Sequence, residues 1–254
     1  MSPSFRKALS RLGAAAFWLL LWALLAARVG QELLLPSPPQ VLQTLLRLAG
    51  GADFWLTVSA SILRVLGGLL AGCVLGLLLA FLTAASPIAH ALISPLMTLV
   101  KSTPVASFII LALVWLGRGT VPLLITGLIV LPVVWANVSA GIAAQDIKLR
   151  ELAQVYRLSR ARVFRCLTVP TVLPHFRAAL RSALGLGWKA GIAAEVLTVP
   201  PYSIGRRIYE SKLYLETTEL FAWTLTVILL SLLIERLLLR LLAGHGRRGE
   251  GGHA

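Results

Sequence analysis

Long apolar runs, separated by short polar connections, dominate the pattern of the chain. Six of these runs have roughly the length, about 20 residues, that a helix needs to cross a bilayer. They cover Leu12–Val29, Phe54–Ala84, Ile88–Leu116, Val121–Ala144, Val172–Val199 and Leu220–Leu242. The pattern predicts an all-α polytopic membrane protein with six transmembrane helices, and it predicts kinks at Pro104 and Pro132.

Composition supports this fold class. Of the 254 residues, 57% are hydrophobic and 13% are charged, whereas a soluble domain has roughly 25% charged residues. Cys73 and Cys166 form no disulfide or metal-binding pattern, and the chain has no G-x-x-x-x-G-K-[ST] loop for nucleotide phosphates. The net charge of +14 is therefore interpreted through membrane topology, and no nucleic-acid partner is expected.

The distribution of lysine and arginine predicts the orientation. With a cytoplasmic N-terminus, the inner segments carry more than twice as many of these residues as the outer ones. We expect a cytoplasmic N-tail (1–11), a transmembrane domain (12–242) with a cytoplasmic loop (145–171), and a disordered C-tail (243–254). The basic start of the chain also fits a secretory signal peptide, but no cleavage site opens a polar region, so an uncleaved first span is favoured.

Two local patterns concern packing. Ser37 is suited to cap a helix, and Gln40 completes a capping box for it, which predicts a short amphipathic helix lying at the outer membrane interface. In the second run, small residues recur every four positions and predict close approach of another helix. These residues are Gly68, Gly72, Gly76, Ala80 and Ala84.

One charged segment interrupts the apolar pattern near the middle of the chain. The segment Glu151–Pro170, ELAQVYRLSRARVFRCLTVP, contains four arginines, and we refer to it as the basic loop. In the simplest interpretation, the basic loop only fixes the topology of the chain in the membrane. However, its apolar residues, including Tyr156 and Phe164, recur at three- and four-residue spacings that predict two short amphipathic helices. We expect a break near Leu158, with Ser159 capping the second helix.

The basic loop resembles the EAA loop of permease subunits of ABC importers. That pattern is E-A-A-x-x-x-G, nine further residues and then I-x-L-P. Glu151 matches the glutamate, Ala153 the second alanine and Pro170 the final proline. The resemblance extends from about Phe54 to Leu242, includes TPVASFIILALVWLGRG and LGLGWKAGIAAEVL, and is strongest to the sulfonate, taurine and nitrate branch. It implies the type I ABC importer permease fold.

The sequence departs from this pattern at two positions. Leu152 replaces the first alanine, and Arg157 replaces the glycine. Glycine is favoured where φ is positive, so arginine costs about 1 kcal/mol if the same backbone conformation is kept. Two alternatives follow: the turn is rebuilt, or Arg157 contacts the partner directly.

The resemblance implies a transporter subunit that is not itself an enzyme. The basic loop would couple to a cytoplasmic ABC ATPase, which binds ATP and Mg²⁺, while this chain binds no cofactor. Other implied partners are an extracytoplasmic substrate-binding protein, a second copy of the permease and the lipid of the bacterial inner membrane. The residues expected to serve the coupling are Glu151, Ala153, Tyr156, Arg157, Ser159, Phe164 and Pro170.

Charged residues also lie within the apolar runs. Each costs about 2.5–3.5 kcal/mol at a helix centre facing lipid, so each is expected to face a cavity, a partner or the interface. For Arg64 we favour extension to the outer headgroups. We expect Lys101, Lys189 and Glu195 on the pathway of a small anion such as a sulfonate. The alternative for the last two is a structural pair across the dimer, because residues six apart do not share a helix face.

Two other functions remain open from the sequence. An ion-gradient-driven transporter or channel is disfavoured because there is no internal repeat with discontinuous helices and few membrane carboxylates. A non-transporting membrane anchor needs neither the small-residue pattern nor the membrane lysines. ATP-dependent uptake in proteoliposomes separates the ABC permease from both alternatives.

Overall fold

The computed structural model of the chain describes residues 3–244, and every regular element in that range is a helix. The elements are α1 (Pro3–Val29), α2 (Pro38–Ala49), α3 (Ala52–Ala85), α4 (Pro87–Ser102), α5 (Val105–Trp115), α6 (Val121–Ala143), α7 (Ile147–Val155), α8 (Arg160–Val163), the π-helix η1 (Phe164–Thr168), α9 (Val169–Thr198), α10 (Ile204–Leu213) and α11 (Thr217–Gly244). The predicted all-α class is therefore confirmed.

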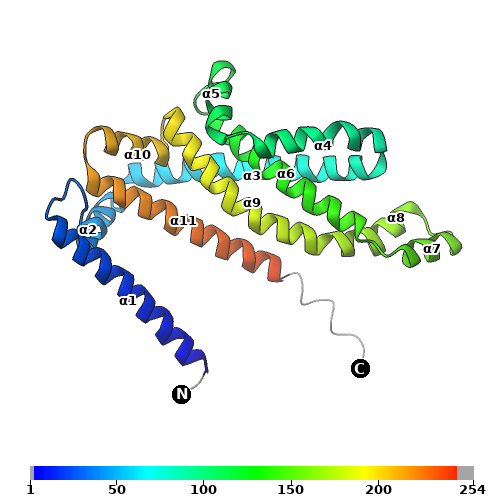
Figure 1. Ribbon diagram of the computed structural model, residues 1–254, viewed down its shortest axis with the longest axis horizontal. Coiled ribbons are helices and arrows are strands. Elements are labelled where there is room, and N and C mark those ends of the chain that lie inside the picture. The colour runs from blue at the N-terminus through cyan, green and yellow to red at the C-terminus, as the bar shows by residue number, and fades with distance from the viewer. Residues whose placement is uncertain (1–2, 245–254) are drawn as a thin grey trace.

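Helices α3, α6 and α9 form the centre of the molecule (Figure 1). The three glycines of the small-residue pattern of α3 lie against α6, as the sequence predicts, whereas Ala84 at the end of the pattern is exposed. A Cβ atom on Gly68, Gly72 or Gly76 would lie 2.3, 2.6 and 2.8 Å, respectively, from a carbonyl oxygen of α6. No side chain fits at such distances, so glycine is what allows the two backbones to approach.

Helix α9 packs against the same part of α6, again through glycines. A Cβ atom on Gly187 would lie 2.9 Å from Val130, and one on Gly191 would lie 2.5 Å from Thr126. The three central helices therefore pack with little space between them, and only one side of α9 remains uncovered.

The predicted six spans are only partly confirmed. Four helical segments of the described chain are long and apolar enough to cross a membrane: Leu12–Val29, Ala52–Ala85, Val121–Ala143 and Thr217–Leu238. The third run is instead two helices, α4 and α5, bent by 105° and counted as one span only if the pair is taken together. Helix α9, the expected fifth span, is less apolar than these four segments because it carries several charged residues. Its 30 residues nevertheless measure about 45 Å, which is long enough to cross a membrane.

The two predicted proline kinks have different outcomes. Pro104 is the N-cap of α5 and follows a residue in extended conformation, so the chain breaks there completely. The residue before a proline rarely adopts helical backbone angles, which explains why α4 ends before Thr103 and Pro104. Pro132 lies inside α6, and the helix continues through it without interruption.

The ends of the bundle differ in character (Figure 1). Helices α2 and α10 lie at one end, and α7 and α8 lie at the other. The capping box of α2 is confirmed, with the backbone N–H of Ser37 donating to Oε1 of Gln40 at 2.8 Å. Helix α1 points away from the bundle and is anchored near α2, where Trp22 stacks on Phe221 and donates from Nε1 to the carbonyl of Pro36 at 3.0 Å.

The expected tails need one correction. Helix α1 begins at Pro3, so most of the expected N-tail, 1–11, is helical. Helix α11 ends at Gly244, and the rest of the expected C-tail lies outside the described residues.

Candidate functional site

The basic loop forms a helix pair at the end of the bundle opposite α2 (Figure 1). Asp146 is the N-cap of helix α7, and its side chain accepts a hydrogen bond from the backbone N–H of Lys148 at 2.8 Å. The helix ends at Val155, and α8 begins at Arg160, which confirms the predicted break. Ser159 has the expected N-cap position, but its side chain makes no capping hydrogen bond.

Arg157 adopts the conformation that a glycine would favour. Its φ is 48°, its N–H donates to the carbonyl of Gln154 at 3.0 Å, and the N–H of Leu158 donates to the carbonyl of Ala153 at 2.9 Å. These bonds close the last turn of α7 in the manner of a left-handed helix C-terminus. Of the two alternatives, rebuilding of the turn is therefore wrong: the turn is kept, at a cost of about 1 kcal/mol for the arginine.

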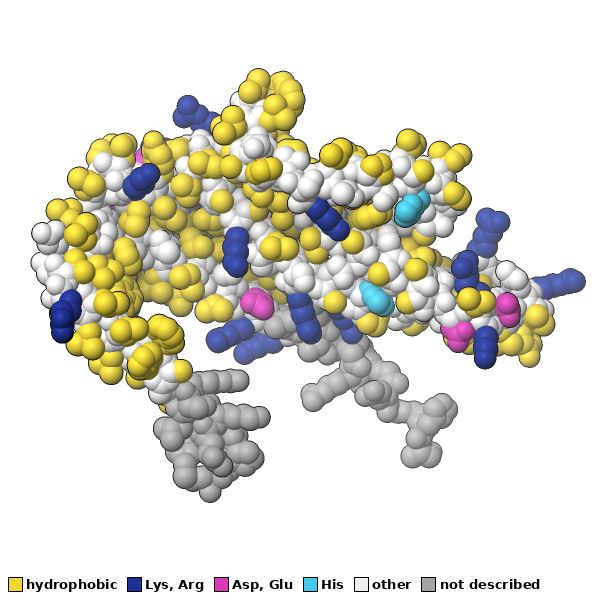
Figure 2. Space-filling model, in the orientation of Figure 1, with side chains coloured by type: hydrophobic (Ala, Val, Ile, Leu, Met, Phe, Trp, Pro, Cys, Tyr) yellow, Lys and Arg dark blue, Asp and Glu magenta, His cyan; other side chains and the backbone are white. Residues whose placement is uncertain are grey.

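Large apolar side chains are exposed on this helix pair. Val155 is 78% exposed and Tyr156 is 70% exposed, while Ala153 is buried. The four arginines of the loop and Glu151 are exposed as well, and none of them has an ion-pair partner among the described residues. Figure 2 shows basic and apolar side chains gathered at this end. Exposed apolar groups within a charged rim are typical of a protein-binding surface.

Phe164 lies where the basic loop meets α3 and α9. Its ring centroid lies 5.7 Å from that of Phe81 on α3, and it lines a cavity of about 170 Å³ together with residues of α3 and α9. Its ring therefore packs toward the membrane helices, although 45% of the residue stays exposed. Pro170 lies in the first turn of α9, directly after η1, so the loop continues into α9 without a flexible linker.

Glu195 lies at the other end of α9 and has no exposed surface. Its carboxylate accepts hydrogen bonds from Oγ of Ser61 at 2.8 Å and from the backbone N–H of Gly205 at 3.2 Å. It also forms an ion pair with Arg64 at 3.4 Å. We call these four residues the Glu195 cluster; it joins α3, α9 and α10.

Arg64 also holds the turn between α9 and α10. Its guanidinium donates to the carbonyl oxygens of Pro201 and Tyr202 at 2.8 and 2.9 Å. The expected extension of Arg64 to the headgroups is thus wrong, since its donors are used inside the protein. Within the single chain, the ion-pair partner of Glu195 is Arg64 and not Lys189; the pair of Lys189 and Glu195 across the dimer stays an alternative.

The three expected pathway residues have different surroundings in the structure. Lys101, in the last turn of α4, and Lys189, on α9, are exposed and have no ion pair among the described residues. Glu195 is enclosed by partners of its own chain. Sequence reasoning did not identify Ser61 and Gly205; the only local signal was the three-residue spacing of Ser61 and Arg64, which puts both on one face of α3.

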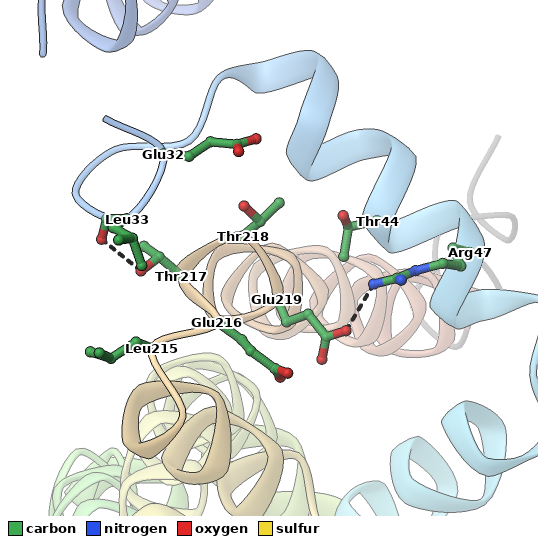
Figure 3. Close-up of a pocket in the computed structure, with 9 residues that line it drawn as sticks. All are labelled: Glu32, Leu33, Thr44, Arg47, Leu215, Glu216, Thr217, Thr218 and Glu219. Carbon is green, nitrogen blue, oxygen red and sulfur yellow. Dashed lines mark hydrogen bonds and ion pairs between the residues drawn. The ribbon is translucent and has the colours of Figure 1, made fainter. Parts of the chain in front are cut away.

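A polar cleft of about 340 Å³ lies near α2 and the start of α11 (Figure 3). Arg47 donates to Glu219 across it at 2.8 Å, and Thr217 donates to the carbonyl of Leu33 at 2.7 Å. These bonds tie α2 and the segment after α1 to α11. Sequence reasoning missed the cleft because its charged partners are far apart along the chain.

Comparisons with known proteins agree with this architecture. Residues 72–245 match the family described as binding-protein-dependent transport system inner membrane component. The chain is 28% identical to the taurine transport system permease protein of Escherichia coli, over 92% of this chain and 87% of that protein. It is 27% identical to the nitrate import permease protein of a Synechocystis species, over 88% and 84% of the two chains. A crystal structure of an amino acid ABC transporter with histidines has the same fold, with a TM-score of 0.60 at 16% identity, covering 76% of this chain and 94% of the other.

Proposed function

Because the chain belongs to the family of inner membrane components of binding-protein-dependent transport systems, and is thus a permease subunit of an ABC importer, we propose that its basic loop receives the cytoplasmic ATPase. A substrate-binding protein is the second kind of partner that membership implies. ATP and Mg²⁺ bind to the ATPase, and this chain holds no nucleotide. Both termini and the basic loop face the cytoplasm, as the distribution of lysine and arginine favours.

The observation that carries the docking proposal is the exposure of Val155 and Tyr156 among unpaired arginines. Burying one such apolar side chain contributes about 1.5–3 kcal/mol, and aromatic residues are frequent energetic centres of interfaces. The arginines steer and orient the partner more than they hold it. A groove with an apolar floor and an acidic rim is the matching surface on the ATPase.

The contacts of the loop support a route from the ATPase to the membrane helices. Phe164 packs on Phe81 of α3, and the loop continues directly into α9. A displacement of the helix pair therefore acts on two of the three central helices. Alternating access needs such a bias between two arrangements of the helices.

We further propose that two copies of the chain form the pathway. The uncovered side of α9 lies on the surface of a single chain, and a second copy related by a two-fold axis would enclose it. The cargo is a small anion or a molecule with an anionic group. Support comes from Lys101 and Lys189, which have no ion-pair partner in the described chain, and from relatives named for taurine and nitrate. A cation in a low-dielectric cavity attracts such a solute.

Reconstitution tests the proposed function. The permease, its ATPase and its binding protein would be placed in proteoliposomes, and uptake of labelled taurine and of labelled nitrate would be measured. We expect uptake of at least one of the two anionic probes only with MgATP on the ATPase side. Uptake driven by a proton or sodium gradient without ATP would instead favour a secondary transporter, and ATPase binding without any transport would favour a membrane anchor.

A further inference from the structure

Helix α9 has one buried side and one exposed side. The buried side, which includes Gly187 and Gly191, packs on α6 and α3. The exposed side consists of residues that recur every three or four positions: Ala178, Arg181, Ser182, Leu186, Lys189, Ala193 and Leu197. Apart from two leucines and two cations, the exposed residues are small.

The two cations, Arg181 and Lys189, lie on either side of the middle of α9. They are eight residues apart, which corresponds to about 12 Å along the helix. No ion pair involves either of them within the described part of the chain. Glu195, on the same helix, differs from them because its carboxylate accepts hydrogen bonds from three donors of the same chain.

A lone cation near the middle of a membrane helix is unfavourable against lipid, and such groups are expected to face a water-filled space or a partner. Two of them on one exposed side make lipid contact doubly unfavourable for that side. The residues beside them, Ala178, Ser182 and Ala193, are exposed and have small side chains. The exposed side of α9 therefore carries the positive charge that an anion pathway requires, with no large side chain between the two cations except Leu186.

We propose that Arg181 and Lys189 are two successive binding stops for the anionic cargo along α9, so that Arg181 takes the place expected for Glu195. This assignment rests on the proposed function, which supplies an anion as cargo. A single dense cation cluster would hold an anion too tightly for release, whereas two stops allow transfer from one to the next. A second copy of the chain would face the cargo with the same pair.

Cysteine labelling tests the proposal without requiring transport. In the reconstituted complex with Cys73→Ala and Cys166→Ser, the variants R181C and K189C would be treated with the anionic 2-sulfonatoethyl and the cationic 2-trimethylammonioethyl methanethiosulfonates. We expect both positions to react. Leu78→Cys is the control, because Leu78 is exposed on an apolar side of α3, and it should react with neither reagent.

The decisive measurement is the preference of R181C for the anionic over the cationic reagent, with and without Lys189→Gln. A unit charge about 12 Å away, at an effective dielectric between those of protein and water, changes this preference about tenfold. We expect Lys189→Gln to lower the preference by about that factor. A tenfold loss confirms that both cations act on the same aqueous space.

Two results would overturn the proposal. One is an R181C variant as unreactive as L78C, which would remove Arg181 from any water-lined path. The other is a preference that does not respond to Lys189→Gln, which would mean that the cations do not share a path. If R181C does not assemble, Ser182→Cys, on the same exposed side with Arg181 retained, takes its place with the same expectation. The expected labelling in a complex without ATP-driven uptake would show a shared aqueous space along α9 but would contradict the proposed function, and with it the assignment of the two cations as stops for a cargo.

Discussion

The basic loop and the Glu195 cluster lie at opposite ends of α9 and treat charge in opposite ways. In the cluster, one buried carboxylate is satisfied by Ser61, Arg64 and Gly205. In the loop, four exposed arginines have no ion pair among the described residues. Charges that are satisfied within the chain fix its structure, whereas charges without partners are available to another molecule. Substitutions in the two regions should therefore have different readouts.

The largest expected effect is on stability, in the Glu195 cluster. Glu195→Ala leaves Arg64 and the N–H of Gly205 without their buried acceptor, and breaking a buried pair by removing one partner costs about 3–5 kcal/mol. We expect a loss of about 3 kcal/mol in the free energy of unfolding, measured in detergent. The control is Glu219→Ala, which removes the more exposed pair with Arg47 and should cost less than about 1 kcal/mol. Equal stability of the two variants would show that the cluster is not structural.

The next effect is on partner binding, in the basic loop. Tyr156→Ala should weaken binding of the ATPase by about 2 kcal/mol, roughly thirtyfold, with little change in the stability of the permease. Tyr214→Ala is a matched control, because Tyr214 is 69% exposed at the other end of the molecule. Binding would be measured by titrating purified ATPase onto the permease in nanodiscs. If both variants bind alike, the exposed apolar residues of the loop are not the docking surface.

A smaller effect, on transport, is expected for Lys189, which belongs neither to the basic loop nor to the Glu195 cluster. Lys189→Gln keeps the approximate size of the side chain and removes its charge, so we expect ATP-driven uptake of the anionic probe to fall about tenfold while the complex stays assembled. Lys212→Gln, on the exposed surface of α10, should leave uptake unchanged. If the complex with Lys189→Gln does not assemble, then Lys189 is a structural charge, as Glu195 is.

The smallest effect concerns the strained turn of the basic loop. Arg157→Gly should relieve the positive φ and stabilise the turn by at most about 1 kcal/mol, whereas Arg150→Gly, inside α7, should cost about as much. Amide hydrogen exchange across residues 153–159 measures both. If Arg157 also contacts the ATPase, Arg157→Gly should weaken the coupling of ATP hydrolysis to uptake; unchanged coupling would show that the side chain makes no contact that matters.

Local patterns were sufficient where the partners lie close in sequence. The capping box of Ser37 and Gln40, the helix break near Leu158 and the glycine-like turn at Arg157 each depend on residues within a few positions. The small-residue pattern of α3 also predicted close packing, although it could not name α6 as the neighbour. The motif residues of the basic loop and their spacing, together with the number of apolar runs, indicated the family.

Features that depend on distant residues could not be predicted. The partners of Glu195 on α3 lie more than 130 residues away along the chain. Helical spacing showed that Phe164 is on an apolar face but not whether this face turns toward α3 or outward. The proline at position 104 predicted a kink but not its size, which is 105° between α4 and α5; both helices contact α6.

The Glu195 cluster has a mechanical consequence for α9. A helix fastened at one end moves like a lever, and the Glu195 cluster is the fulcrum of α9. If the ATPase displaces the opposite end, as proposed, each point on α9 moves in proportion to its distance from Glu195. Arg181 is about 21 Å from the fulcrum and Lys189 about 9 Å, so Arg181 sweeps more than twice as far in each stroke. If the two cations are successive stops, as proposed, the stop nearer the ATPase is therefore the more mobile one, and the stop nearer the fulcrum moves less than half as far.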